Sequence, residues 1–282
     1  MRELLAWGDT LPAAYHDALF RLINKGEFHD CADWGTSQLE ASMTICVEHP
    51  LQEPMISKLF IGGPEELEQY RQEMLDGILD FEVEKGNWTY TYHDRMVNYY
   101  VDNAEYRTDT HKYNYAFNQI DFVINELTRN PSSRRAVILI RDNSEDAFSD
   151  DPACLQHIQY FLHDNKLDCK VLFRSNDACK AAFMNMFALI LLQKKIADTL
   201  GAEVGHYVHR ANSFHCYAKD SNTLNSYATR IIASEELNDG FAGTTFDRGL
   251  KDLAYNYVGE WDELMEEAKP KIAKKVEELK NR

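Results

Sequence analysis

The chain has 282 residues, of which 44% are hydrophobic and 12% aromatic, so it can bury a substantial core in one large domain or two small ones. Its formal net charge of −16 argues against a broad nucleic-acid-binding or membrane-binding surface, because phosphate binding needs clustered lysines and arginines. A small anion pocket built from a few arginines is compatible with that charge.

Hydrophobic periodicity predicts both helices and strands in the first half of the chain. Helices are predicted over residues 13–25, 64–80 and 113–128, and a strand over residues 41–49. Pro64, followed by acidic residues, is typical of a helix start, and the Asn130-Pro131 pair ends the third helix.

The second half continues this mixture. Strands are predicted over residues 135–140, 154–163, 167–175 and 204–217, and a long apolar helix over residues 182–200. The tail from Glu260 onward is a charged amphipathic helix that Pro270 breaks or kinks. With no linker rich in Gly, Pro or Ser, we expect one α+β (α/β layered) domain over residues 1–282, with the charged helix at about 260–282.

Several features predict a cytoplasmic protein. The N-terminus lacks an apolar signal core, and the longest apolar run, residues 187–192, is too short to cross a bilayer. The six cysteines form no CxxC pair, so we expect reduced thiols and no metal site.

Cys154, in the segment DDPACLQH, is the first candidate for chemistry. A lone cysteine is most often a small buried hydrophobic residue. Cys154, however, follows a proline at the head of a predicted strand, where a side chain can face a pocket. A thiolate there needs a nearby cation to lower its pKa.

Arginines are available for that purpose. Arg134 and Arg135 are adjacent in NPSSRRAV, a pattern that is often simply solvated. Arg174 is followed by Ser175 in FRSND. Guanidinium groups beside hydroxyls are also suited to binding a phosphate.

Three further polar residues allow two interpretations each. Asn185 interrupts the apolar helix, where an unpartnered amide costs about 1–3 kcal/mol, so it either caps local backbone or meets a ligand. An amide can accept N3–H and donate to O4 of uracil. His215 and Tyr217 alternate along a strand and face the same side, as core rings or as groups that hold a sugar hydroxyl.

The order of these motifs resembles the thymidylate synthase family, including the phage deoxycytidylate hydroxymethylases and the short archaeal synthases. The similar region runs from about Glu73 to Tyr217, and Asn185 follows Arg174 by eleven residues, as in the family pattern. The resemblance implies a thymidylate-synthase-like fold, with a mixed twisted sheet flanked by helices and one sheet face in a homodimer interface.

The resemblance also implies catalytic roles. Cys154 matches the nucleophile that adds to C6 of a pyrimidine, and the resulting enolate attacks the one-carbon unit of 5,10-methylenetetrahydrofolate. Glu73 matches the general base, and Tyr90 the tyrosine that orders water and the C5 proton. Asp177 matches the aspartate at the folate pterin, and Asn185 the amide at the base.

The binding roles follow in the same way. Ala181 stands where the family has a glycine in the folate site. The implied nucleotide ligands are Arg174 and Ser175 at the phosphate, Arg134 and Arg135 reaching the phosphate of the other subunit, and His215 and Tyr217 at the sugar 3′-hydroxyl.

Departures from the family favour hydroxymethylation, in which water completes the reaction, over methylation to dTMP with dihydrofolate release. Leu155 follows the cysteine where synthases usually have His, and Ser213 replaces an Asp. The segment between Glu73 and Tyr90 is too short for the family's tryptophan-containing stretch over the folate, which makes the intermediate easier for water to reach.

Single residues bear on the choice between uracil and cytosine and on the alternative functions. Asn185 favours dUMP over dCMP, because cytosine-specific members carry Asp there. Trp34 stands where the phosphate loop of the family has a basic residue. This substitution and the one at Ala181 favour an alternative, in which the chain is a catalytically silent relative that binds a nucleotide. A cysteine hydrolase is disfavoured, because His157 faces away from Cys154 along the strand.

Overall fold

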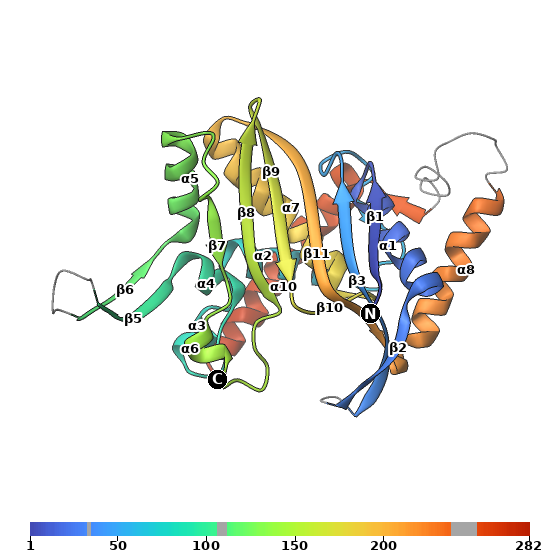
Figure 1. Cartoon of the computed structure of the whole chain (residues 1–282), viewed down its shortest axis with the longest axis horizontal. Helices are drawn as coiled ribbons and strands as arrows, with labels where there is room; N and C mark the ends of the chain where they lie inside the picture. The colour runs from blue at the N-terminus through green and yellow to red at the C-terminus, as the bar shows by residue number, and fades with distance from the viewer. Residues whose placement is uncertain (33–34, 106–111, 238–252) are drawn as a thin grey trace.

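The computed structural model describes residues 1–32, 35–105, 112–237 and 253–282. Its centre is an eight-stranded sheet (Figure 1). In sheet order, the main strands are β1 (Glu3–Gly8), β3 (Thr36–Val47), β11 (Glu203–Tyr217), β9 (Lys166–Phe173), β8 (Leu155–His163) and β7 (Val137–Leu139). β2 (Glu27–Cys31) pairs with β3, and β10 (Asn176–Asp177) pairs with β11.

The sheet is mixed. β1 runs parallel to β3, and β11 parallel to β9, whereas β3–β11, β9–β8 and β8–β7 are antiparallel pairs. Side chains alternate between the two faces, so that in β9 Leu167, Cys169 and Val171 are buried while Asp168 and Lys170 are not. One face of the sheet therefore carries the core.

Helices lie behind that face in the view of Figure 1. α1 (Leu11–Lys25) packs on β1 and β3, and α7 (Ala181–Leu200) packs on β9 and β11. α2 (Pro64–Asp76) lies against α7, and α10 (Asp262–Lys280) lies against α2. Because α7 is enclosed between the sheet and α2, it is apolar on nearly all sides rather than along one stripe.

Smaller elements complete the described chain. The helices are α3 (Phe81–Glu84), α4 (Tyr92–Val97), α5 (Gln119–Arg129), α6 (Asn143–Asp146) and α8 (Ser221–Leu237), with the short turns η2 (Ala218–Asp220) and η3 (Tyr257–Trp261). The strands are β4 (Ile56–Ser57), paired with β12 (Ala254–Tyr255), and β5 (Tyr99–Glu105), paired with β6 (Lys112–Phe117).

The predicted helix over residues 113–128 is wrong in its first third. Residues up to Phe117 form β6 and pair with β5, and the helix begins only at Gln119. Asn118 caps it, because its side-chain oxygen accepts the backbone N–H groups of Ile120 and Asp121. The predicted end before Asn130 is confirmed.

Of the two alternatives predicted for Pro270, a break or a kink in the helix, the break does not occur. α10 continues from Asp262 to Lys280 with Pro270 inside it. Met265, Ala268 and Ile272 are buried on the side that packs against α2, and this packing offsets the one backbone hydrogen bond that proline cannot donate.

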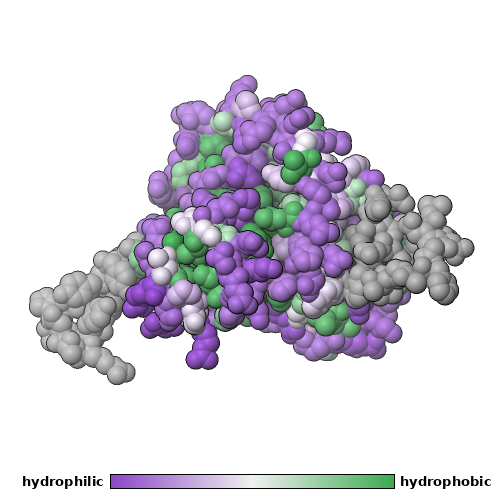
Figure 2. Space-filling model, turned by 90° about the horizontal axis from the view of Figure 1, so that it is seen from above, coloured by the Kyte–Doolittle hydropathy of each residue, from purple (hydrophilic) through white to green (hydrophobic). Residues whose placement is uncertain are grey.

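The other face of the sheet is open to the viewer in Figure 1. It exposes Leu5 and Trp7 of β1 near the ion pair of Arg210 with Glu3, and Leu139 of β7 at the opposite edge of the sheet. From above, the described surface is mostly hydrophilic with small apolar patches (Figure 2), in keeping with the net charge of −16. No helix of the described residues is long and apolar enough to cross a membrane.

Candidate active site

A cavity of about 630 Å³ lies beside the segment that leads into β8. Its walls come from α2, the start of α7, β10, the end of β11 and the loops before α4 and β8. The cavity brings together these predicted site residues: Glu73, Tyr90, Cys154, Ser175, Asp177, Ala181, Asn185, His215 and Tyr217. Segments separated by more than a hundred residues in the sequence thus share one site.

Cys154 lies at the end of the loop that precedes β8 and is half-buried. Burial raises the pKa of its thiol, and the positive charge of Arg174 opposes this shift without cancelling it. Without a ligand, the protein therefore holds Cys154 mainly as a thiol. An additional positive charge or a proton acceptor would favour the thiolate.

Arg174 does not line the cavity but holds the loop that carries the cysteine. Its Nε donates to the carbonyl of Ala153 at 3.1 Å, and its Nη2 donates to the carbonyl of Pro152 at 2.6 Å. The backbone N–H of Arg174 donates to the carbonyl of Cys154 at 2.8 Å. One arginine thus fixes the position of the thiol and supplies the nearest positive charge.

Glu73 projects from α2 into the cavity. Burial raises the pKa of its carboxyl, although Gln69 donates a hydrogen bond of 2.7 Å to Oε1 and opposes the shift. A carboxyl with a raised pKa can accept and return a proton more readily near neutral pH. Glu73 is therefore suited to acid–base chemistry.

Asn185, on the first turns of α7, is 4% exposed and faces the cavity. Its Oδ1 accepts a hydrogen bond from the hydroxyl of Tyr70 on α2. The amide therefore does not cap local backbone. Its Nδ2 has no protein partner among the contacts of the described residues, which leaves that donor for a ligand.

His215 carries an unpartnered nitrogen at the cavity wall. Its ring is 3% exposed, and Nε2 is buried with no hydrogen-bond partner, while Nδ1 lies 3.2 Å from Ser213 Oγ. Burial lowers the pKa of His215, so the ring is neutral. Tyr217 meets it edge-on, with ring centroids 4.7 Å apart. A buried polar atom without a partner is rare in proteins, and a ligand hydroxyl would satisfy this one.

Asp177 lies on β10, which pairs with β11 beside His215. Its Oδ1 accepts the backbone N–H of Cys179 at 2.9 Å, and burial raises the pKa of its carboxyl. Ala181 begins α7 on the same side of the cavity. These two residues therefore lie together, as the resemblance implied.

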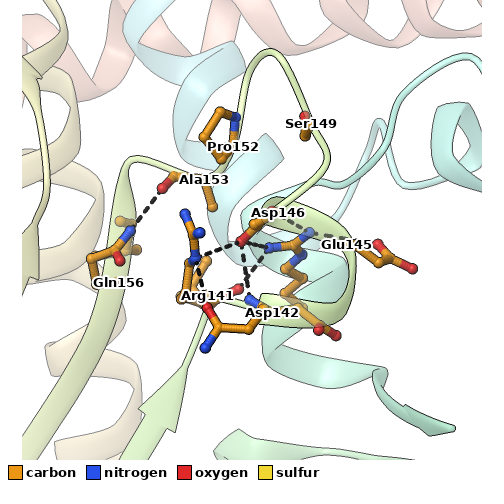
Figure 3. A network of polar contacts seen from close by, with 12 residues as sticks. Arg141, Asp142, Glu145, Asp146, Ser149, Pro152, Ala153 and Gln156 are labelled. Carbon is orange, nitrogen blue, oxygen red and sulfur yellow. Dashed lines mark hydrogen bonds and ion pairs between the residues drawn. The ribbon is translucent and has the colours of Figure 1, made fainter.

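A buried ion pair supports the loop before Cys154. Asp146 lies at the centre of the polar network in Figure 3, where it meets Arg141 and the backbone N–H of Asp142. Arg95 of α4 donates to both oxygens of Asp146 and lies over the ring of Tyr90, 4.5 Å from its centroid. The tyrosine and the cysteine loop are thus tied to one guanidinium group.

Comparisons with known proteins agree with this set of cavity residues. A model of the thymidylate synthase family matches residues 65–239, more than half of the chain. The chain belongs to the thymidylate synthase family. This confirms the family predicted from the motifs.

Individual thymidylate synthases share only moderate sequence identity with this chain. It is 28% identical over 226 residues to a provisionally named thymidylate synthase of Methanocaldococcus jannaschii, covering 77% of this chain and 93% of that protein. It is 32% identical over 108 residues to thymidylate synthase of Bacillus licheniformis, but only 38% of each protein is covered.

The fold agrees with the family. Thymidylate synthase A from Bacillus subtilis superimposes with a TM-score of 0.60 at 18% identity, covering 78% of this chain and 84% of that chain. The predicted fold class, a mixed sheet flanked by helices, is thereby confirmed.

The three predicted phosphate-binding arginines do not line the cavity: Arg174, which holds the cysteine loop, and the adjacent pair Arg134 and Arg135. The side chains of Arg134 and Arg135 are exposed, and Arg135 pairs with Glu126 of its own chain at 2.8 Å. Trp34, at the position expected for the phosphate loop, lies outside the described residues.

Several aromatic residues of this cavity were not among the predicted site residues. Trp88 lines it and is 46% exposed. It belongs to the segment between Glu73 and Tyr90 that we expected to be too short for the family's tryptophan-containing stretch. Tyr70 and Tyr92 line it as well. Tyr70 lies one helical turn before Glu73, and this spacing on the predicted helix could have identified it.

Proposed function

We propose that this chain transfers a one-carbon unit from 5,10-methylenetetrahydrofolate to C5 of a pyrimidine nucleoside 5′-monophosphate, with dUMP as substrate and a hydroxymethyl group as product. The observation that carries the proposal is the convergence of Cys154, Glu73, Asn185 and His215 on one cavity. A nucleophile, an acid–base group, a base-reading amide and a sugar ligand are the parts that this chemistry needs.

Cys154 adds to C6 of the pyrimidine in the proposed mechanism, which makes C5 nucleophilic. The thiol must first lose its proton, because burial keeps its pKa high in the free enzyme. The nearby charge of Arg174 assists the ionisation. Asn185 stabilises the charge that develops on the ring, since its Nδ2 can donate to O4.

Glu73 is the proton acceptor for C5. Burial raises the pKa of Glu73, so its carboxyl holds a proton more readily than an exposed carboxyl does. Tyr90, fixed over Arg95, lies on the same wall and can order a water molecule between Glu73 and the ring. Burial raises the pKa of Tyr90 to about 12, so it remains a neutral hydrogen-bond donor.

The folate co-substrate supplies a one-carbon unit at the oxidation level of formaldehyde, and in the proposed hydroxymethylation tetrahydrofolate leaves and water adds to the transferred carbon. Asp177 can accept N–H groups of a pterin, and the face of Trp88 can stack on a flat ring. A cavity of about 630 Å³ is within the range of small-molecule sites and can take a nucleotide with part of a second ligand.

Polar residues favour water as the final reactant. Asn87, Thr89, Ser149 and Asp151 line the cavity near Tyr90, and such side chains can hold ordered water. The specific observation that favours the second candidate, methylation of dUMP to dTMP, is Trp88, which can shield the intermediate from solvent.

The phosphate requires cations from outside the chain's own cavity. None of the described residues that line the cavity is Lys or Arg, whereas Glu73, Asp151 and Asp177 are acidic. A dianionic phosphate would be unfavourable there alone. We therefore include a homodimer in the proposal, in which the exposed Arg134 and Arg135 of a second copy reach this site across the open sheet face.

The product identifies the reaction. The protein is incubated with 5,10-methylenetetrahydrofolate and dUMP, and the nucleotide is identified by mass spectrometry while absorbance is followed for dihydrofolate. A hydroxymethyl product without dihydrofolate supports the proposal, and a methyl product with dihydrofolate supports thymidylate synthase activity instead. Absence of tritium release from C5-labelled dUMP, with Cys154→Ala as the control for background, would contradict both and identify a silent nucleotide-binding relative.

Subunit mixing tests the homodimer. Cys154→Ala and the double variant Arg134→Ala/Arg135→Ala are each expected to have little activity. A mixed dimer carries one site with both an intact cysteine and intact arginines from its neighbour, so mixing should restore up to about a quarter of the wild-type activity. No recovery, or a monomer by light scattering, would refute this part of the proposal.

A further inference from the structure

Tyr70 makes a contact that none of the assigned roles uses. It projects from α2 across to α7, where its hydroxyl donates to Oδ1 of Asn185. Both residues line the cavity, and Asn185 is 4% exposed. The contact joins the residue that faces the base to a different helix of the core.

This hydrogen bond determines which way the amide of Asn185 points. Among the described residues, Asn185 Oδ1 is the one recorded acceptor for the Tyr70 hydroxyl. Burial raises the pKa of Tyr70 well above its ordinary value, so the phenol keeps its proton and acts as a donor. Oδ1 is therefore held toward Tyr70, with one lone pair remaining, and Nδ2 is turned away from it.

We propose that Tyr70 is a specificity-determining residue, which selects uracil over cytosine by fixing the amide orientation of Asn185. The inference rests on the proposed function, because it assumes that Asn185 faces a pyrimidine. In the fixed orientation, the remaining lone pair of Oδ1 accepts N3–H of uracil and Nδ2 donates to O4. Cytosine presents an acceptor at N3 and a donor at C4, so both contacts become repulsive.

A flipped amide would match cytosine, and Tyr70 disfavours the flip. The flip turns Nδ2 toward the Tyr70 hydroxyl, which could accept from it. The phenolic proton would then lose its acceptor, and no other is recorded among the described residues. Leaving a buried donor unsatisfied is costly enough to bias binding by roughly five- to a hundredfold.

The test compares the dissociation constants of dUMP and dCMP by calorimetry for the wild-type protein and for Tyr70→Phe, which keeps the ring and removes the hydroxyl. The wild type should prefer dUMP, and Tyr70→Phe should reduce that preference by roughly five- to a hundredfold, mainly through tighter binding of dCMP. Tyr92→Phe is the matched control: it removes a hydroxyl from the same cavity, where it accepts the backbone N–H of Leu155 and does not contact Asn185. Its preference ratio should equal that of the wild type.

Further variants separate the amide flip from a general disturbance. Tyr70→Met removes the hydroxyl with a different side chain and should shift the ratio in the same direction as Tyr70→Phe. In an Asn185→Asp background, Tyr70→Phe should leave the ratio unchanged, because a carboxylate has two equivalent oxygens and nothing to flip.

Three results would overturn the inference: an unchanged ratio in Tyr70→Phe or Tyr70→Met, an equal change in Tyr92→Phe, or a wild type that prefers dCMP. Binding of neither nucleotide to the wild type would instead refute the proposed function. The two failures are therefore distinguishable.

Discussion

The guanidinium of Arg95 donates to both carboxylate oxygens of Asp146, at 2.8 and 2.9 Å, and the two side chains are only 7% and 0% exposed. The pair joins α4 to the loop that ends at Cys154. The same guanidinium also contacts the ring of Tyr90. The Arg95–Asp146 pair therefore supports both Tyr90 and the loop that carries Cys154.

Removing one partner of this pair should destabilise the protein strongly. Arg95→Met leaves the buried Asp146 carboxylate with only Arg141, 3.7 Å away, as a counter-charge, and we expect the free energy of unfolding to fall by about 3–5 kcal/mol in urea denaturation. Replacing both residues, in Arg95→Met/Asp146→Leu, should restore most of that loss. Arg21→Met, which breaks the more exposed pair with Asp17, is the control and should cost less than about 1 kcal/mol. Equal losses in the two single variants would refute the special role of the buried pair.

The reactivity of Cys154 should depend on Arg174. Arg174 lowers the pKa of the thiol against the larger effect of burial, so Arg174→Gln should raise that pKa further. The pH at which iodoacetamide modifies Cys154 at half its maximal rate is expected to move upward, as measured by mass spectrometry of the modified peptide. Arg210→Gln, on the open sheet face, should leave the profile unchanged. A downward shift in Arg174→Gln would contradict the assignment.

Glu126 should make the stability of the protein depend on acid pH. The pKa of Glu126 is lowered from 4.5 to about 2. The largest cause is the hydrogen bond from Ser133, and the next are the hydrogen bond from Arg129 and the positive charges of Arg129 and Arg135. A lowered pKa contributes stability above the ordinary value of 4.5, and that contribution is lost as the pH falls toward 2. Glu126→Gln should therefore flatten the decline in unfolding free energy over this interval. The exposed Glu267→Gln is the comparison, and an equally steep decline in both variants would count against the prediction.

Trp88 should contribute to folate binding more than to nucleotide binding. It lines the cavity while remaining 46% exposed, which is the position expected of a ring that covers a flat ligand. With nucleotide present, Trp88→Ala should weaken folate binding by about tenfold and change the nucleotide affinity much less. Phe148→Ala, which removes a ring that is 89% exposed and outside the cavity, should affect neither. Loss of nucleotide affinity alone would show that Trp88 covers the other ligand.

Local signals were reliable where a residue's own neighbours determine its structure. The predictions nearly matched the observed positions of the apolar helix α7 and of the strands on either side of the turn at Asp164 and Asn165. They also placed the start of α2 correctly at Pro64. The ordered motifs also identified most of the cavity, because each functional side chain sits at a fixed offset within its own strand or helix.

The two errors in predicted secondary structure both involve partners outside the local segment. Residues 113–117 carry a helical pattern, yet pairing with β5 makes them a strand. Pro270 stays within α10 because α2 packs beside it.

Local spacing and composition were enough to indicate the family, the alternation of helices and strands, and the residue types available for chemistry. Folding of the chain was needed to show that Tyr70 meets Asn185 across 115 residues, that Arg95 meets Asp146 across 51, and that Arg134 and Arg135 lie away from the chain's own cavity. Such contacts depend on how the elements pack and on strand register, and no local pattern encodes either.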